Sequence, residues 1–148
     1  RDRVDNFGYV SRMDNLQAAL LNYRLKKLDQ IIDRRRKNAE SYLEYIETDD
    51  VYVPREKEYE FNTYHTFVIQ VEKRNELKEF LLKQGIESAI HYPRPIHLQP
   101  AARRLGYKLG DFPITEKQAG MILTLPVNQS LGQSEIERIC AAINDYYN

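Results

Sequence analysis

A proline-rich stretch in the second half of the chain holds the residue types best suited to ligand recognition. Residues 91–100 read HYPRPIHLQP, and three of these ten positions are proline. Proline fixes its own backbone and favours extended or turn conformations in the residue before it, so this loop should be stiff. Tyrosine, arginine and histidine side chains on a rigid loop suit small-molecule binding. The alternative, a loop that merely caps the sheet, stays open. The predicted pocket residues are Tyr92, Arg94, His97 and His91.

A second candidate site lies near the N-terminus, where residues 7–14 read FGYVSRMD. A glycine turn at Gly8 leads directly into a helical pattern, and Ser11 or Asp14 can cap that helix. Unpaired N–H groups at a helix start also attract anions such as phosphate. By residue type alone, simple capping is the favoured interpretation.

Other catalytic chemistry has little support. No glycine-rich nucleotide motif, serine-hydrolase elbow or zinc-protease helix motif occurs in the sequence. Cys140 falls on the apolar face of a predicted helix, which favours packing over nucleophilic reactivity. His65 opens a predicted strand and is interpreted as structural. His91 and His97 would need a third metal ligand, and because nothing singles out the nearest carboxylate, Asp111, we predict no metal site.

A long helical pattern must position the N-terminal segment. Apolar residues recur at spacings of mostly three, four or seven from Met13 to Ile46, without glycine or proline. This predicts one long helix, or two joined by a bend. A helix of this length usually bridges two domains or packs on a partner, and if it bridges domains, Leu20 should be buried between them. The basic run at 33–37 is either a solvated face or a phosphate-binding patch.

Short strand and helix patterns alternate downstream and predict an α+β fold. We expect a long N-terminal bridging helix and a small, mostly antiparallel sheet covered by helices on one side. The bridging segment would occupy residues 1–46, and a C-terminal small α/β domain residues 47–148. The predicted strands are 51–53, 64–71, 86–90 and 123–127; the predicted helices are 72–84, 101–105, 113–122 and a last helix that opens with the capping pattern Ser134-Glu135-Ile136-Glu137.

Composition narrows the class of protein. The 148 residues include 22 basic and 22 acidic side chains, and this balance argues against nucleic-acid binding as the main function. One cysteine excludes an internal disulfide framework and fits a reducing compartment. No apolar run approaches the roughly 20 residues of a membrane helix, so we expect no membrane contact and a cytoplasmic location. The chain starts with Arg1 rather than Met, and we expect it to begin inside a longer one.

Two stretches, taken together, resemble one enzyme family. Residues 8–19 read GYVSRMDNLQAA, and residues 91–101 read HYPRPIHLQPA, followed by LGY at 105–107 and GDFP at 110–113. A weaker match is LTLP at 123–126. In this order they resemble the C-terminal portion of pyridoxal-phosphate-dependent sugar aminotransferases of the DegT/StrS type. The resemblance spans nearly the whole chain.

The resemblance implies the aspartate aminotransferase fold (fold type I), a homodimer or larger assembly, and pyridoxal 5'-phosphate as cofactor. It implies transfer of an amino group, usually from glutamate, to a nucleotide-linked keto sugar. The family's Schiff-base lysine lies on the large domain, before the Gly-Tyr segment. We therefore expect no catalytic residue in this chain and no activity from it alone. Tyr92 and His97 match the family's pocket loop.

One departure from the family is at Val10. The family usually has Asn there, which reaches a cofactor phosphate across the dimer interface, and Val cannot donate that hydrogen bond. Ser11 and Arg12 are the candidates for a replacement phosphate contact. Two other functions stay open: a pyridoxal-phosphate-dependent sugar dehydratase of the same fold, and a non-catalytic regulatory or scaffold module, which Val10 favours slightly.

Overall fold

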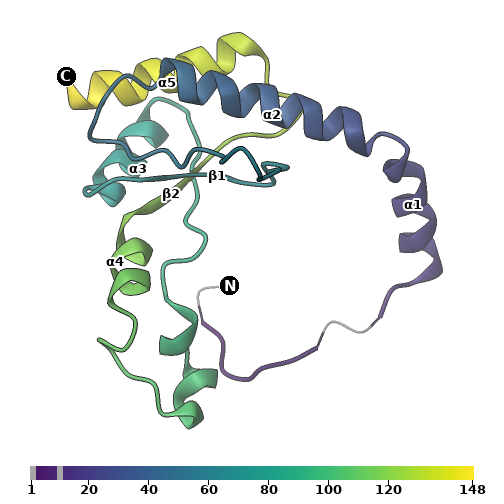
Figure 1. The fold of residues 1–148 in the computed structure, drawn as a ribbon, viewed down its shortest axis with the longest axis vertical. Helices are drawn as coiled ribbons and strands as arrows, with labels where there is room; N and C mark the ends of the chain where they lie inside the picture. Colours follow the sequence, from purple (N-terminus) through teal and green to yellow (C-terminus); the bar gives the residue numbers. More distant parts are fainter. Residues whose placement is uncertain (1–2, 10–11) are drawn as a thin grey trace.

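Two long helices lie side by side over a two-stranded antiparallel sheet (Figure 1). The structure is a computed structural model that describes residues 3–9 and 12–148. It is a mixed helix and sheet fold, as the sequence predicts. The elements are α1 (Asn15–Leu25), α2 (Leu28–Tyr45), β1 (Phe67–Gln70), α3 (Arg74–Lys83), α4 (Pro113–Met121), β2 (Ile122–Leu125) and α5 (Gln133–Tyr147), with short 3-10 helices at Ile96–Leu98 and Pro100–Leu105.

The core lies between the sheet and helices α2, α3 and α5. Phe67 and Ile69 of β1 alternate with half-buried neighbours and pair with Leu125 and Leu123 of β2. Tyr42 of α2 stacks on Phe67 with 4.6 Å between ring centroids. Full burial of each such side chain contributes roughly 1.5–3 kcal/mol. The fully enclosed side chains include Tyr42, Ile69, Leu77, Leu81, Leu123, Ile136 and Ile143.

The long helical pattern is divided in two by a bend after Leu25. At this bend the N–H of Lys27 bonds the carbonyl of Arg24 at 3.0 Å, and α2 then starts at Leu28. Helix α1 turns away from the sheet (Figure 1) and has no buried residue. Leu20 is 58% exposed in this chain, so its burial would require residues that this chain does not supply.

The strand predicted at 64–71 is shorter than expected, covering only Phe67–Gln70. Tyr64 has a φ of 46°, which interrupts the extended backbone. The carbonyls of Tyr64 and His65 accept hydrogen bonds from the Arg35 guanidinium. The backbone there is therefore bound to α2 and does not join the sheet ladder.

The predictions of full strands at 51–53 and 86–90 are wrong. Each contributes one isolated bridge, Tyr52 to Gln70 and Ala89 to Thr124. The N–H of Ile86 instead bonds back to Leu81 across Gly85, whose φ of 73° closes α3.

The capping pattern at Ser134 is also wrong. Helix α5 starts at Gln133 with Gly132 as its N-cap residue. The Glu135 carboxylate accepts the N–H of Gly132 at 2.8 Å, so the capping glutamate precedes the predicted Glu137 by two positions.

The N-terminal segment returns to the proline-rich loop, although the two are far apart in sequence (Figure 1). The carbonyl of Val4 accepts the N–H of Ala101 at 2.8 Å. The N–H of Val4 donates to Oε1 of Gln99 at 3.0 Å. These two bonds hold the start of the described chain beside residues 99–101.

Candidate functional site

Side chains in the proline-rich loop alternate between exposed and enclosed positions. Tyr92 and Arg94 are exposed, Tyr92 by 55%. His91 is half-buried, and His97 is only 7% exposed. Tyr92 and Arg94 precede the 3-10 helix Ile96–Leu98, whereas His97 lies within it. Of the four predicted pocket residues, Tyr92 and Arg94 can therefore meet a ligand, whereas the two histidines face this chain's own interior.

The two ends of the loop are anchored by side-chain hydrogen bonds. Nδ1 of His91 lies 3.0 Å from Oγ1 of Thr124 on β2. The Gln99 side chain accepts the N–H of Val4, and its Nε2 donates to the carbonyl of Arg94 at 3.4 Å. Tyr92 and Arg94 form the exposed edge of the proline-rich loop. This exposed edge is held by β2 on one side and by the N-terminal segment on the other.

The buried imidazole of His97 is bound by a glutamate of α4. Its Nε2 lies 2.9 Å from Oε1 of Glu116, and its ring centroid lies 4.8 Å from that of Phe112. The Glu116 carboxylate also accepts the backbone N–H groups of Gly110 and Phe112. Burial by itself would raise the pKa of Glu116, but the hydrogen bonds from His97, Gly110 and Phe112 outweigh it and lower that pKa. The sequence offered no signal for this pairing, because the partners lie 19 positions apart.

The predicted N-terminal phosphate site is partly described. Ser11 lies outside the described residues, as does Val10. Arg12 is exposed, two residues before Asp14, the N-cap of α1. The N–H of Asp14 donates to Oε1 of Gln17 at 3.3 Å, so capping satisfies one backbone group there. The exposed guanidinium of Arg12 is the described group that suits an anion at this end of α1.

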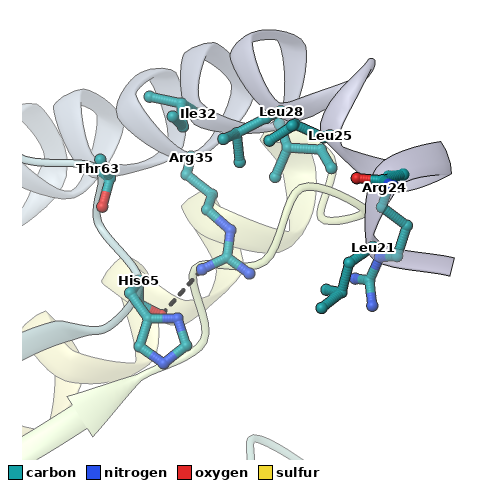
Figure 2. A pocket seen from close by; sticks show the side chains of 10 residues that line it. Leu21, Arg24, Leu25, Leu28, Ile32, Arg35, Thr63 and His65 are labelled. Atoms are coloured by element: carbon teal, nitrogen blue, oxygen red, sulfur yellow. Dashed lines mark hydrogen bonds between the residues drawn. The ribbon is translucent and has the colours of Figure 1, made fainter. Parts of the chain in front are cut away.

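An apolar groove that the sequence analysis did not predict lies where α1 meets α2 (Figure 2). Its volume is about 690 Å³. On its polar side, Arg35 donates to the backbone carbonyl of His65 at 2.9 Å (Figure 2). The available signal was the leucine and isoleucine recurrence on both sides of the bend. The lining residues are Leu21, Asn22, Arg24, Leu25, Leu28, Ile31, Ile32, Arg35, Thr63 and His65.

Arginines of the basic run at 33–37 donate hydrogen bonds to loops of this chain. Arg36 contacts both carboxylate oxygens of Glu56, at 3.0 and 2.8 Å. Arg35 bonds two carbonyls before β1, and Arg34 donates to the carbonyl of Gln129 at 3.3 Å. Arg35 and Arg36 are half-buried and bound to acceptors of this chain, so they form no free phosphate patch, whereas Asp33, Arg34 and Lys37 are exposed, as the interpretation of a solvated face predicts.

Several kinds of site find no support in the part of the chain that the structure describes. Across residues 3–9 and 12–148, no cluster of three or more His, Cys, Asp or Glu side chains could hold a metal ion. In the same ranges, no helix has both the length and the hydropathy needed to span a bilayer. No lysine there is buried.

The sequence matches a family model over residues 1–144, and that family is described as the DegT/DnrJ/EryC1/StrS aminotransferase family. A pleiotropic regulatory protein of Geobacillus stearothermophilus is 38% identical over 95% of this chain and 38% of its own length. The dTDP-3-amino-3,6-dideoxy-alpha-D-galactopyranose transaminase of Aneurinibacillus thermoaerophilus is 35% identical, over 94% of this chain and 38% of its own length. This chain thus spans well under half the length of the curated relatives it matches.

Solved structures agree in fold. The crystal structure of S. venezuelae DesV superimposes with a TM-score of 0.86 at 32% identity, over 91% of this chain and 37% of that one. A DegT DnrJ EryC1 StrS aminotransferase from Brucella abortus gives a TM-score of 0.84 at 31% identity, over 93% of this chain and 36% of that one.

Proposed function

We propose a function from one premise: this chain belongs to the DegT/DnrJ/EryC1/StrS aminotransferase family, as the match over residues 1–144 shows. In this proposal the chain is the C-terminal part of a pyridoxal-phosphate-dependent aminotransferase. Its substrate is a nucleotide-linked keto sugar, and glutamate is the amino donor. The whole protein works as a homodimer, in the reducing cytoplasmic setting that the single thiol suggests.

The family match is the observation that carries the proposal. The names of relatives add support for the substrate class, since they include transaminases of dTDP-linked sugars and an aminotransferase of a UDP-linked sugar. A shared nucleotide diphosphate suggests that the binding site needs a cationic group for phosphate oxygens. Arg94, on the exposed edge of the loop, has the geometry for paired contacts to such oxygens.

The residues of this chain suit the surroundings of pyridoxal phosphate better than its covalent attachment. A lysine that forms a Schiff base usually sits in a desolvated or cationic pocket that lowers its pKa, whereas every described lysine is exposed or only half-buried. We therefore assign the attachment lysine to residues beyond this chain. Arg12 is assigned to the cofactor phosphate. The cofactor itself would supply the electron sink for amino transfer.

The loop residues then have distinct roles. Tyr92 and Arg94 bind and orient the substrate from the exposed edge. His91 and His97 fix the backbone of that edge through Thr124 and Glu116. A fixed edge matters because misplacing a substrate by about 1 Å can cost on the order of 100-fold in rate.

The groove between α1 and α2 fits the role of α1 as a bridge to another domain. Leucine and isoleucine side chains line it, and three of the leucines, Leu21, Leu25 and Leu28, are exposed in this chain, as is typical of a surface that another part of a protein covers. We assign its cover to the part of the whole protein that the relatives have and this chain does not contain.

A regulatory function is the second candidate. The observation that favours it is the name of one relative, a pleiotropic regulatory protein at 38% identity. In that case the edge at Tyr92 and Arg94 would bind a ligand without turning it over.

The deciding experiment uses the whole protein with pyridoxal phosphate, glutamate and a panel of dTDP- and UDP-linked keto sugars. We expect one of these sugars to yield an amino sugar with an equal amount of 2-oxoglutarate, both measured by mass spectrometry. Loss of water from the sugar without nitrogen transfer would identify a dehydratase instead. Failure to retain pyridoxal phosphate, together with no product, would favour the regulatory function.

A second measurement tests whether the chain is inactive alone. The 148-residue chain is incubated with pyridoxal phosphate, reduced with borohydride and desalted. We expect no stoichiometric adduct on any lysine, and a stable adduct at one position would contradict the assignment of the attachment lysine to another segment.

A further inference from the structure

We propose that Glu116 is a positioning residue that holds the exposed Tyr92–Arg94 edge through the buried imidazole of His97. The proposal rests on the proposed function for the identity of the ligand. Glu116 lies on α4, and its carboxylate contacts His97, Gly110 and Phe112.

The Glu116 carboxylate joins three parts of the chain. Its Oε1 accepts from Nε2 of His97, in the 3-10 helix that follows the edge, at 2.9 Å. Both carboxylate oxygens accept the N–H of Gly110, at 2.9 and 3.0 Å, and Oε1 lies 3.3 Å from the N–H of Phe112. The carboxylate therefore fixes the turn at 110–112 and the end of the loop at the same time.

The hydrogen bond between His97 and Glu116 is costly to lose because both side chains are largely buried. The side chain of His97 is 5% exposed and that of Glu116 is 14% exposed. A donor left without an acceptor in such a site loses its water as well as its partner, which is costly. Without the carboxylate, Nε2 of the enclosed His97 ring would lack an acceptor and its segment would have to rearrange to reach water, whereas the exposed Gly110 amide would lose only its link to α4.

The path from Glu116 to the exposed edge is short, because His97 lies three residues after Arg94, and Gln99, which donates to the carbonyl of Arg94, follows two residues later. His91 is held by Thr124, and Gln99 is held by Val4. Between these two ends, His97 is the enclosed side chain that ties the loop to α4. Its ring also packs on Phe112, within the same turn that Glu116 fixes.

The test compares Glu116→Leu, which keeps the approximate size but removes both acceptors, with Glu116→Gln, which keeps one carbonyl acceptor. Glu135→Leu and Glu135→Gln are the matched controls, because Glu135 also accepts a glycine N–H, that of Gly132, but at the start of α5. All variants are made in the whole protein. Amide hydrogen exchange is followed by mass spectrometry, and the binding of dTDP and of UDP by calorimetry.

We expect Glu116→Leu to speed exchange roughly tenfold or more in peptides covering 106–113 and also in those covering 92–99. It should weaken binding of the preferred nucleotide roughly tenfold. Glu116→Gln should recover most of the protection and most of the affinity. The Glu135 variants should leave both at wild-type values.

Faster exchange confined to 106–113 would overturn the proposal, because Glu116 would then be only a cap for its own turn. Nucleotide affinity that stays unchanged in Glu116→Leu while 92–99 loosens would also overturn it. If the wild-type protein binds neither nucleotide, the proposed function fails, and the exchange data alone decide whether Glu116 holds the loop.

Discussion

Arg36 and Glu56 form a bidentate salt bridge between α2 and the loop that precedes β1. The guanidinium nitrogens lie 3.0 and 2.8 Å from the two carboxylate oxygens, and Arg36 also donates to the carbonyl of Asn62 at 2.7 Å. The guanidinium carbon lies 4.6 Å from the ring centroid of Phe61. Arg36 thus binds the loop before β1 to the core helix α2, next to the bonds from Arg35 to Tyr64 and His65.

The pair predicts a pH-dependent contribution to stability. The hydrogen bond from Arg36, followed by that from the N–H of Asn62, lowers the pKa of Glu56 in the folded state. A carboxyl whose pKa is lower when folded stabilises the protein above its unfolded pKa of about 4.3, and this contribution disappears as the pH falls through the folded pKa. Glu56→Gln should therefore lower the urea midpoint at pH 7 and have a much smaller effect in strong acid.

Urea unfolding of wild type and Glu56→Gln at several pH values measures this difference. Glu58→Gln, at an exposed position of the same loop, is the control for loss of one charge. A midpoint difference that does not change with pH would show that the pair does not act through the Glu56 charge.

Removal of the Tyr42 hydroxyl should also lower the stability of the fold. The hydroxyl donates to the carbonyl of Pro126 at 2.7 Å from a fully enclosed ring, and burial raises its pKa strongly. Tyr42→Phe should lower the free energy of unfolding by about 1 kcal/mol, as for a typical buried hydrogen bond. Chemical denaturation measures this, with the half-buried Tyr45→Phe as the milder control. Equal effects of the two changes would rule out a special role for the Tyr42 bond.

Leu20 tests the bridging role of α1. Because this side chain is 58% exposed, Leu20→Ala should change the stability of the 148-residue chain by less than about 1 kcal/mol. In the whole protein it should cost roughly 2–5 kcal/mol, if another domain covers α1. Leu77→Ala, at a fully enclosed position of α3, should cost that much in both. A small effect of Leu20→Ala in the whole protein would mean that this face of α1 stays in water.

We expect the thiol of Cys140 to react slowly with disulfide reagents in the folded protein. Burial raises the pKa of Cys140 to about 12, and the thiolate is the reactive form. An aromatic disulfide reagent at pH 8 should label it only at the rate of unfolding, and at once in urea. Rapid labelling of the folded protein would show that the helix α5 face opens in solution.

The sequence predicted the helices and the core well, because these depend on local periodicity. Cys140, predicted to lie on the apolar face of the last helix, is confirmed as buried, together with Ile136, Ile139 and Ile143. The strand predicted at 123–127 is likewise confirmed as β2, although it covers Ile122–Leu125 and ends before Pro126. These signals lie within a few residues of the feature they predict.

The loop and the arginine run could not be predicted in the same way, because their partners are distant in sequence. Which side chains of 91–100 face inward depends on Thr124 and Glu116. The partners of Arg34 and Arg36 lie in loops 95 and 20 positions away. The bend after Leu25 has no glycine or proline to mark it. Spacing within a segment contains none of this information.

The hydrogen bonds between Val4 and the segment 99–101 connect the N-terminal segment with the exposed edge of the proline-rich loop. Val4 and Gln99 are 95 positions apart, so their contact closes one large loop of chain, and α1 is part of that loop. The Gln99 side chain that accepts the N–H of Val4 also donates to the carbonyl of Arg94. A displacement of Val4 would therefore reach the backbone of Arg94 through this one side chain.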